Sequence, residues 1–226
     1  MVSRLLYRDG LMLVIDKPAG YAVHRGPKGG ESLEDHFDAL RFGLPRSPSL
    51  AHRLDRDTSG CLVLGRHRKA LASLGKLFKN GQIGKTYWAV VDGGPTEDQG
   101  RIDLALAKRD ESRGWWMKPD PDGQPAVTNW TLLGRSPDKT LSWLAMEPVT
   151  GRTHQLRLHA AENGWPIIGD AIYGAAPRSG GPILHLHSRE IVVPISKNKD
   201  PVRVIAPVPA HMRDRLMACG WPGNEP

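Results

Sequence analysis

The sequence predicts an α+β fold in which hairpin-like strands are mixed with a few helices. Short β-prone apolar runs recur between Gly, Pro and Asp turn signals, whereas apolar residues at helical spacing occur in only a few segments. Strand and helix signals do not alternate as a regular βαβ repeat would require. At 226 residues the chain is long enough for one large domain or two small ones, and no convincing linker separates its halves. We predict this domain over residues 1–221, followed by a loose tail at 222–226.

Two strands and two helices are expected in the first third of the chain. Residues 11–15 form a β-prone apolar run that is ended by an Asp-Lys-Pro-Ala-Gly turn signal. A helix is expected to begin at Ser32, because apolar residues follow at helical spacing and prolines stand beyond its end. Residues 61–64 are typical of a buried strand, and a basic helix with Ala70 and Leu74 on its apolar face follows.

The middle third is richer in strand signals. Residues 86–91 are largely aromatic and apolar, and Gly93 and Pro95 end this run. A loop that contains two adjacent tryptophans is expected at residues 114–119. Around this loop, apolar runs and turn signals predict three further strands, at residues 101–106, 126–133 and 141–147.

A helix, short strands and a last helix are expected in the final third. The first of these helices is predicted over residues 153–163, because Asn163 and Gly164 form a helix stop signal. The last helix is predicted over residues 209–218, with Pro209 in its first turn. Between them we expect short strands at residues 183–186, 189–193 and 202–206.

The charge and cysteine content limit the class of partner and the compartment. A net charge of +7 and an isoelectric point near 9.6 favour a polyanionic partner, with nucleic acid first and an anionic membrane surface second. Cys61 and Cys219 are the only cysteines, so the sequence offers no disulfide framework and fits a reducing compartment. No apolar run approaches the roughly 20 residues that span a bilayer, and no signal peptide is evident. We therefore expect a cytoplasmic protein.

Motifs for cofactor-dependent chemistry are not found. Gly84-Lys85-Thr86 resembles the end of a phosphate-binding P-loop, but Lys79 stands where that motif requires glycine, and a strand follows where a helix should. The sequence also offers no zinc-protease, zinc-deaminase, serine-hydrolase or dinucleotide-binding pattern. We expect an enzyme without cofactor or metal, or a binding protein.

The segment from His52 to Gly60 reads His-Arg-Leu-Asp-Arg-Asp-Thr-Ser-Gly and places one carboxylate, Asp55, between two arginines. Adjacent guanidinium groups favour the charged form of a carboxylate, so we expect Asp55 to be ionised. Such a carboxylate can act as a nucleophile without a neighbouring general base. Taken alone, however, an aspartate in a loop is more often a turn residue or a helix cap.

Read as a whole, this segment resembles the signature of pseudouridine synthases of the RluA type. The resemblance implies that Asp55 is the nucleophile and that no cofactor is needed. It also implies the pseudouridine synthase fold, with a mixed, largely antiparallel central sheet flanked by helices and loops. We expect five neighbours of Asp55 to bind the substrate: His52, Arg53, Leu54, Arg56 and Thr58.

Tyr87 lies in the segment Lys85-Thr86-Tyr87-Trp88-Ala89. On residue type alone, an aromatic in a strand usually packs in the core. Enzymes that act on a base must take it out of its stack, however, and an aromatic ring can then hold it. The resemblance implies this second role, with Tyr87 stacked on the target uracil, and we expect Lys85 to contact the RNA backbone.

Residues 150–159 read Thr-Gly-Arg-Thr-His-Gln-Leu-Arg-Leu-His and precede or begin a predicted helix. A basic helix is most often a solvated face. The resemblance instead implies that Arg157 pairs with the nucleophile Asp55 and keeps it charged. It also implies that Leu156 lines the uracil pocket, and we expect Arg152 to contact phosphate.

The resemblance extends from residue 7 to about residue 210, through further matching segments at residues 7–24, 164–174, 184–188 and 206–209. We interpret residues 164–174 as structural, because Gly and Pro there set sharp turns. A departure occurs at Gly65-Arg66, where the family usually has Ala followed by Lys or Thr. The match begins so early that we expect a short form without an added RNA-binding module of the ribosomal protein S4 type.

These inferences predict an RNA pseudouridine synthase that isomerises specific uridines in a stem-loop of tRNA, of large-subunit (23S) rRNA, or of both. We expect a monomer whose partner is RNA and which uses no membrane, metal or cofactor. The alternative is a non-catalytic RNA-binding or ribosome-assembly protein on the same fold. A P-loop kinase or ATPase is a distant third. The sequence does not choose between attack on the sugar and attack on the ring.

Overall fold

A computed structural model describes residues 1–26, 29–110, 116–196 and 198–224. The chain forms two compact units, each built from two segments. Unit 1 contains Met1–Lys85 and Ser188–Pro207, and unit 2 contains Thr86–His187 and Val208–Pro226. The expectation of one domain over residues 1–221 stays a prediction. The end of the expected tail, residues 225–226, lies outside the described residues.

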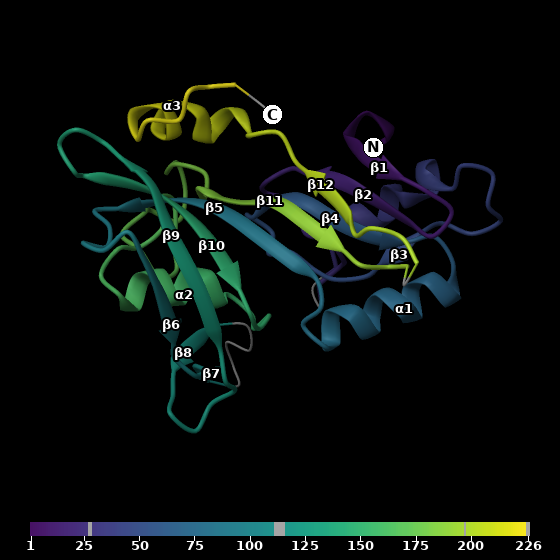
Figure 1. Cartoon of the computed structure of the whole chain (residues 1–226), viewed down its shortest axis with the longest axis horizontal. Coiled ribbons are helices and arrows are strands. Elements are labelled where there is room, and N and C mark those ends of the chain that lie inside the picture. The colour runs from purple at the N-terminus through teal and green to yellow at the C-terminus, as the bar shows by residue number, and fades with distance from the viewer. Residues whose placement is uncertain (27–28, 111–115, 197, 225–226) are drawn as a thin grey trace. The chain divides into compact units, whose positions relative to one another are not determined.

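Unit 1 is built on strands in the order β1-β2-β4-β11, with β12 paired to β11 and β3 paired to β4 (Figure 1). The pairs β1–β2, β2–β4, β3–β4 and β11–β12 are antiparallel. A short 3₁₀ helix, η1 (Val2–Arg4), precedes β1. The strands are β1 (Leu5–Arg8), β2 (Met12–Lys17), β3 (Ser49–Leu50), β4 (Ser59–Gly65), β11 (Leu186–Val193) and β12 (Val202–Ile205).

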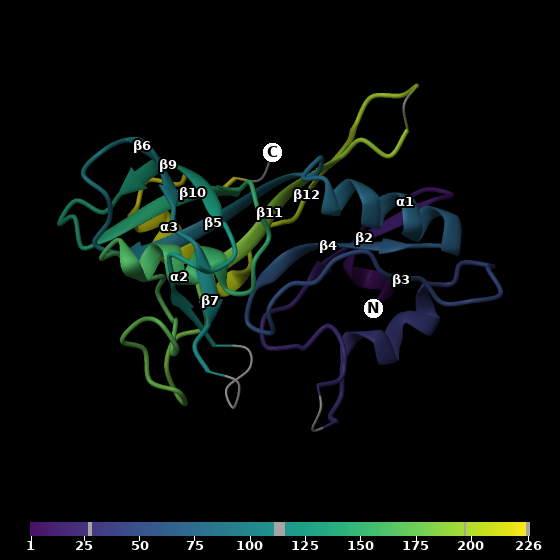
Figure 2. The same cartoon turned by 90° about the horizontal axis from the view of Figure 1, so that it is seen from below.

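Helical segments cover both faces of the strands of unit 1. Figure 2 shows α1 (Arg68–Lys79) on one side of β2 and β4, and η2 (Leu33–Leu40) on the other. All seven residues of β4 are buried, and the central part of β2 is buried as well. A strand covered on both faces consists of a nearly continuous apolar run, which explains why the sequence predicts these two strands clearly.

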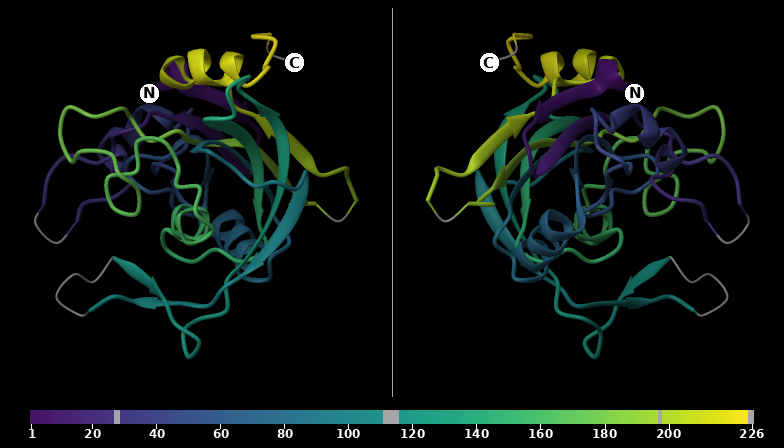
Figure 3. Two further views of the ribbon diagram at one scale, coloured as in Figure 1. Left: turned by 90° about the vertical axis from the view of Figure 1, so that its left-hand side faces the viewer. Right: turned by 90° about the vertical axis from the view of Figure 1, so that its right-hand side faces the viewer.

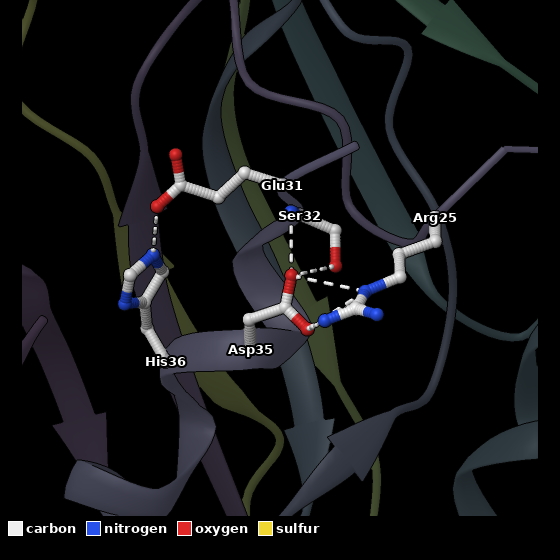
Figure 4. Close-up of polar contacts among 5 residues, drawn as sticks. All are labelled: Arg25, Glu31, Ser32, Asp35 and His36. Carbon is white, nitrogen blue, oxygen red and sulfur yellow. Dashed lines mark hydrogen bonds and ion pairs between the residues drawn. The ribbon is translucent and has the colours of Figure 1, made fainter. Parts of the chain in front are cut away.

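The helix expected from Ser32 is present, but it is a 3₁₀ helix. Ser32 is its N-cap, and its backbone N–H and hydroxyl donate to the Asp35 carboxylate at 2.8 and 3.1 Å (Figure 4). Asp35 also pairs with Arg25 at 2.8 Å, and this guanidinium, together with the Ser32 N–H, lowers the pKa of Asp35 to about 2. His36 pairs with Glu31 at 2.9 Å nearby. The capping box fixes the start of the helix.

Unit 2 is built on antiparallel strands in the order β5-β10-β9-β6. The helices α2 and α3 lie on opposite faces of these strands (Figures 1 and 2). A separate two-stranded ribbon, β7–β8, stands away from the main strands of the unit (Figure 3). The elements are β5 (Gly84–Asp92), β6 (Gln99–Asp103), β7 (Leu106–Lys108), β8 (Met117–Pro119), β9 (Val127–Arg135), β10 (Leu141–Pro148), α2 (Gln155–Glu162) and α3 (Ala210–Ala218).

The predicted α+β class with a largely antiparallel sheet is confirmed, but some elements differ. The strands expected at residues 183–186 and 189–193 are one strand, β11, which begins at Leu186. His187 and Ser188, which separate the two expected strands, are buried inside it. The loop expected at residues 114–119 ends in strand β8, and its residues 114 and 115 lie outside the described residues. Strands β1 and β3 were not predicted. Within the described ranges, no helix is long and apolar enough to cross a bilayer.

Candidate active site

Asp55 occupies the first position of a tight turn just before β4. The Thr58 N–H donates to the Asp55 backbone carbonyl at 3.2 Å, and Arg56 and Asp57 form the exposed corner of the turn. Leu54 and Thr58 are buried on either side, while Asp55 itself is partly exposed. The buried flanks hold the turn in place, and the exposed corner carries charge toward solvent.

A buried lysine forms hydrogen bonds with the backbone of this turn. Lys17, at the end of β2, is fully buried, and its ammonium group donates to three backbone carbonyls. The acceptors are Pro18 at 2.9 Å, Arg56 at 2.8 Å and Thr58 at 2.8 Å. An ammonium has three donors, so these contacts use all of them. Lys17 thus connects the carbonyls on both sides of Asp57 to the end of β2.

The setting of Lys17 also has an electrostatic consequence. Burial lowers the pKa of Lys17 to about 7, against the opposing effect of the Asp57 and Asp55 carboxylates. A second contact joins the same turn to the loop after β2. The Gly20 N–H donates to the Arg56 carbonyl at 2.9 Å, and the Arg56 Nε donates back to the Gly20 carbonyl at 2.9 Å. The Asp55 turn is therefore fixed by at least three long-range contacts.

His52, at the start of the signature segment, braces β4 against α1. Its Nε2 accepts the Val63 N–H at 3.0 Å, and its ring stacks on Phe78 with centroids 4.5 Å apart. Burial, with a smaller effect of Lys85, lowers the pKa of His52 to about 3. A substrate-binding role for His52 stays a prediction, and the structure adds this packing role.

We expect His52 to make unit 1 sensitive to acid. Its folded-state pKa lies below that of an unfolded histidine, near 6.5, so the unfolded chain binds the proton first as the pH falls. The free energy of unfolding should then decrease from about pH 6.5 toward pH 3, by about 1.4 kcal/mol per pH unit. The variant His52→Gln does not titrate and can still accept the Val63 N–H. Urea denaturation at pH 7 and pH 4.5 should show about 2.5 kcal/mol less acid destabilisation in this variant than in the wild type. An identical pH dependence in both proteins would contradict the assignment.

Tyr87 and Lys85 lie near the start of β5. Tyr87 is 9% exposed and pairs in register with Met146 of β10. Lys85 belongs to unit 1 and is partly buried, and burial lowers its pKa. An exposure of 9% is compatible with an aromatic residue packed in the core and with one that stacks on the target uracil, so the role of Tyr87 stays a prediction.

The structure buries most of α2. Every residue from Gln155 to Ala160 is buried, with Leu156 at 6% and Arg157 at 4% exposure. The alternative that this basic helix is a solvated face is therefore wrong. Arg157 makes a bidentate ion pair with Asp170, from Nε to Oδ2 at 2.7 Å and from Nη2 to Oδ1 at 2.8 Å. Asp170 was not predicted as a site residue, because residues 164–174 contain glycine and proline that indicate turns.

The loop before α2 is fixed by the side chain of Gln155. Its Oε1 accepts from the Thr150 hydroxyl at 2.7 Å and from the Arg152 N–H at 3.0 Å. Its amide nitrogen donates to the Val127 carbonyl at 2.9 Å and to Thr128 at 3.0 Å. The loop therefore has a defined shape against β9.

Two residues of the same loop have distinct positions. His154 is the N-cap residue of α2 and has a left-handed conformation, with φ of 54°. A strained conformation of a non-glycine residue is often found at functional sites. Arg152 is exposed, and its Nε donates to the Pro125 carbonyl at 3.0 Å, which leaves its expected contact with phosphate a prediction.

The sequence-predicted site residues are divided between the two units. Unit 1 holds His52, Arg53, Leu54, Asp55, Arg56, Thr58 and Lys85, and unit 2 holds Tyr87, Arg152, Leu156 and Arg157. Asp55 and Arg157 belong to different units, and the expected ion pair between them stays a prediction. In the described ranges, no three His, Cys, Asp or Glu residues are grouped so as to hold a metal ion.

The fold defines the class of protein. The solved structure of human RNA pseudouridylate synthase domain containing 4 matches with a TM-score of 0.79 and 25% sequence identity, over 96% of this chain and 94% of that one. Human RNA pseudouridylate synthase domain containing 1 matches with a TM-score of 0.74 and 27% identity, over 91% of this chain and 83% of that one. The chain therefore has a pseudouridine synthase fold.

The sequence comparisons give the family. The profile of the RNA pseudouridylate synthase family matches residues 11–162, and the chain belongs to this family. It is 42% identical over 218 residues to an uncharacterized RNA pseudouridine synthase of Zymomonas mobilis, covering 95% of this chain and 97% of that one. It is 34% identical over 225 residues to ribosomal large subunit pseudouridine synthase C of Vibrio cholerae, covering 94% and 68%. The resemblance to RluA-type synthases is thus confirmed.

Proposed function

We propose that this protein isomerises specific uridines of tRNA, of large-subunit rRNA, or of both to pseudouridine, with Asp55 as the nucleophile. The observation that carries the proposal is the position of Asp55. Asp55 is a partly exposed residue on a turn whose backbone is held by the buried Lys17 and by the reciprocal contact between Gly20 and Arg56. A nucleophile needs this combination of access and fixed position.

The reaction balances without any added reagent. The bond between N1 and C1′ of the uridine breaks, the uracil turns over, and a bond forms between C5 and C1′. The proton leaves C5 and N1 ends protonated, so substrate and product are isomers. Asp55 forms a covalent bond during this exchange and is released at its end. Whether it bonds to the sugar or to the ring is open, and both routes use the same carboxylate.

The other predicted residues take supporting roles in this proposal. Tyr87 stacks on the uracil after it has left the helix, and Leu156 forms part of the pocket wall. Arg157 pairs with the Asp55 carboxylate and keeps it charged. RNA contacts come from His52, Arg53, Leu54, Arg56, Thr58, Lys85 and Arg152.

An RNA substrate is supported by charge and by the names of relatives. The net charge of +7 favours binding to a polyanion, and Arg53, Arg56 and Arg152 are exposed. The relative from Vibrio cholerae is named for the large ribosomal subunit. We propose that this protein works as a monomer in the cytoplasm, without a metal or cofactor.

Pseudouridine mapping of total tRNA and rRNA, with and without the gene, tests the proposal. We expect one or a few sites to lose the modification in the deletion strain. The intact gene should restore them, and the gene for Asp55→Asn should not. A map that does not change on deletion would count against the enzyme and favour the non-catalytic RNA-binding alternative.

A further inference from the structure

We propose that Asp170 is a positioning residue for this reaction, which acts by fixing the guanidinium of Arg157. The inference rests on the proposed function, because Arg157 is the residue proposed to hold the nucleophile. The sequence around Asp170 indicates only a turn. The structure gives it one through three observations: its ion pair, its anchorage to β5 and its link to Tyr173.

The ion pair between Arg157 and Asp170 is buried and bidentate. The side chains of Arg157 and Asp170 are 5% and 0% exposed, and two parallel hydrogen bonds of 2.7 and 2.8 Å join them. The Asp170 Oδ1 also accepts the N–H groups of Ile172 at 2.9 Å and Tyr173 at 3.1 Å. Burial alone would raise the pKa of Asp170, but Arg157 and these N–H groups lower it instead. A carboxylate held this firmly in its charged form is suited to hold a partner and unsuited to transfer protons.

The backbone that carries Asp170 is anchored to β5. The Ile168 N–H donates to the Val90 carbonyl at 2.9 Å, and Ile167 forms a bridge with Val91. On the other side, the His185 N–H donates to the Ile168 carbonyl at 2.8 Å. Tyr87 lies three residues before Val90 on the same strand. Asp170 therefore connects α2, which carries Arg157, to the strand that carries Tyr87.

Gly169 allows this segment to pack closely. Its φ is 82°, and a Cβ at this position would lie 2.4 Å from the Ile183 carbonyl oxygen. Any larger residue would push the backbone next to Asp170 away from its neighbour. The carboxylate is thus fixed from the backbone side as well as by its ion pair.

Tyr173 supports the same guanidinium from another direction. Its ring lies 5.5 Å from the Arg157 Cζ, in cation–π contact. Its hydroxyl accepts the Met117 N–H at 2.9 Å and lies 2.9 Å from the His154 Nδ1. Arg157 is therefore held by the carboxylate of one residue and the ring of another, both from the turn at residues 170–173.

The geometry explains how one arginine can serve two carboxylates. A guanidinium has five N–H donors in a planar fork, and Asp170 binds the Nε and Nη2 edge. This arrangement orients the remaining Nη donors in a fixed direction. If Arg157 pairs with Asp55 as proposed, Asp170 determines where the Asp55 carboxylate is held.

The first test uses Asp170→Asn and Asp170→Glu, with pseudouridine formation measured on a substrate RNA from the mapping experiment. Asp170→Asn removes the charge, and we expect kcat to fall by about 30-fold while KM changes less than about threefold. Asp170→Glu keeps the charge and displaces it by one methylene, so it guards against loss of folding in the first variant. We expect its kcat to fall by about tenfold. Rates are expressed per RNA-binding site, measured by titration, so that unfolded protein does not count.

A double mutant separates positioning from general stability. If Asp170 acts through Arg157, the double mutant Asp170→Asn/Arg157→Lys should have a kcat less than about threefold below that of Arg157→Lys alone. The control is Leu216→Ala, a buried core residue of α3 in the same unit, whose kcat per binding site should stay within about threefold of the wild type. A kcat of both Asp170 variants within twofold of the wild type, or multiplicative effects in the double mutant, would overturn the inference while the proposed function stands. A wild-type protein without any turnover would overturn both.

Discussion

Asp55→Asn is expected to lower the rate of pseudouridine formation by on the order of 10⁴-fold or more, because it removes the nucleophile. Asparagine has nearly the same size as aspartate, and the contacts that shape the turn use backbone carbonyls and Lys17. The turn should therefore keep its form. We expect the affinity for RNA to stay within about threefold of the wild type, since a neutral amide adds no repulsion toward phosphate.

The rate is measured under single-turnover conditions with enzyme in excess, and the affinity by fluorescence anisotropy of labelled RNA. Asp57→Asn is the matched control. It makes the same chemical change two residues along the same turn, at an exposed position, and should leave the rate within about threefold. A rate for Asp55→Asn above about one hundredth of the wild type would count against the nucleophile. Equal losses in the two variants would show that the charge of the turn, and not Asp55 itself, is what matters.

The elements that could be predicted from the sequence are those with a clear local pattern. The strand around residues 61–64 and the basic helix after it were found, because an unbroken apolar run and a helical apolar face are local signals. The continuity of β11 was not predicted, since two strands were expected there and the residues between them, His187 and Ser188, are polar but buried. Burial of polar residues depends on partners far away in the chain, which no local pattern contains.

The candidate site shows the same division. Asp55, Tyr87 and Arg157 could be proposed from short motifs that resemble a known family. Lys17 and Asp170 could not, since their partners lie 39 and 13 residues away along the chain. A signal existed for Lys17: a lysine at the end of an otherwise apolar strand needs several acceptors if it is buried. For Asp170, which stands in a glycine-rich turn, a turn role was the simpler interpretation.

Gly60 is the position in unit 1 where we expect a single methyl group to cost the most stability. It follows the Asp55 turn as the second residue of β4, with φ of 103°, in the region that side chains rarely adopt. A Cβ there would lie 2.3 Å from the carbonyl oxygen of Ser188 and 2.8 Å from its carbonyl carbon. Both contacts are with backbone of the same unit, so the strands would have to move apart.

We therefore expect Gly60→Ala to reduce the free energy of unfolding by about 3–5 kcal/mol, as the sum of backbone strain and overpacking. Gly20→Ala measures the backbone strain alone, because Gly20 has a similar φ of 86° and no atom beyond its chain neighbours lies within 4 Å of the position of its Cβ. That variant should lose only about 1–2 kcal/mol. Denaturation midpoints in urea, followed by tryptophan fluorescence and circular dichroism, give both values. The difference between the two variants measures how tightly β4 packs against Ser188, and with it how firmly the start of β4 holds the Asp55 turn. Similar losses in both would mean that the strand can shift to accept a methyl group, and that the start of β4 does not hold the Asp55 turn firmly.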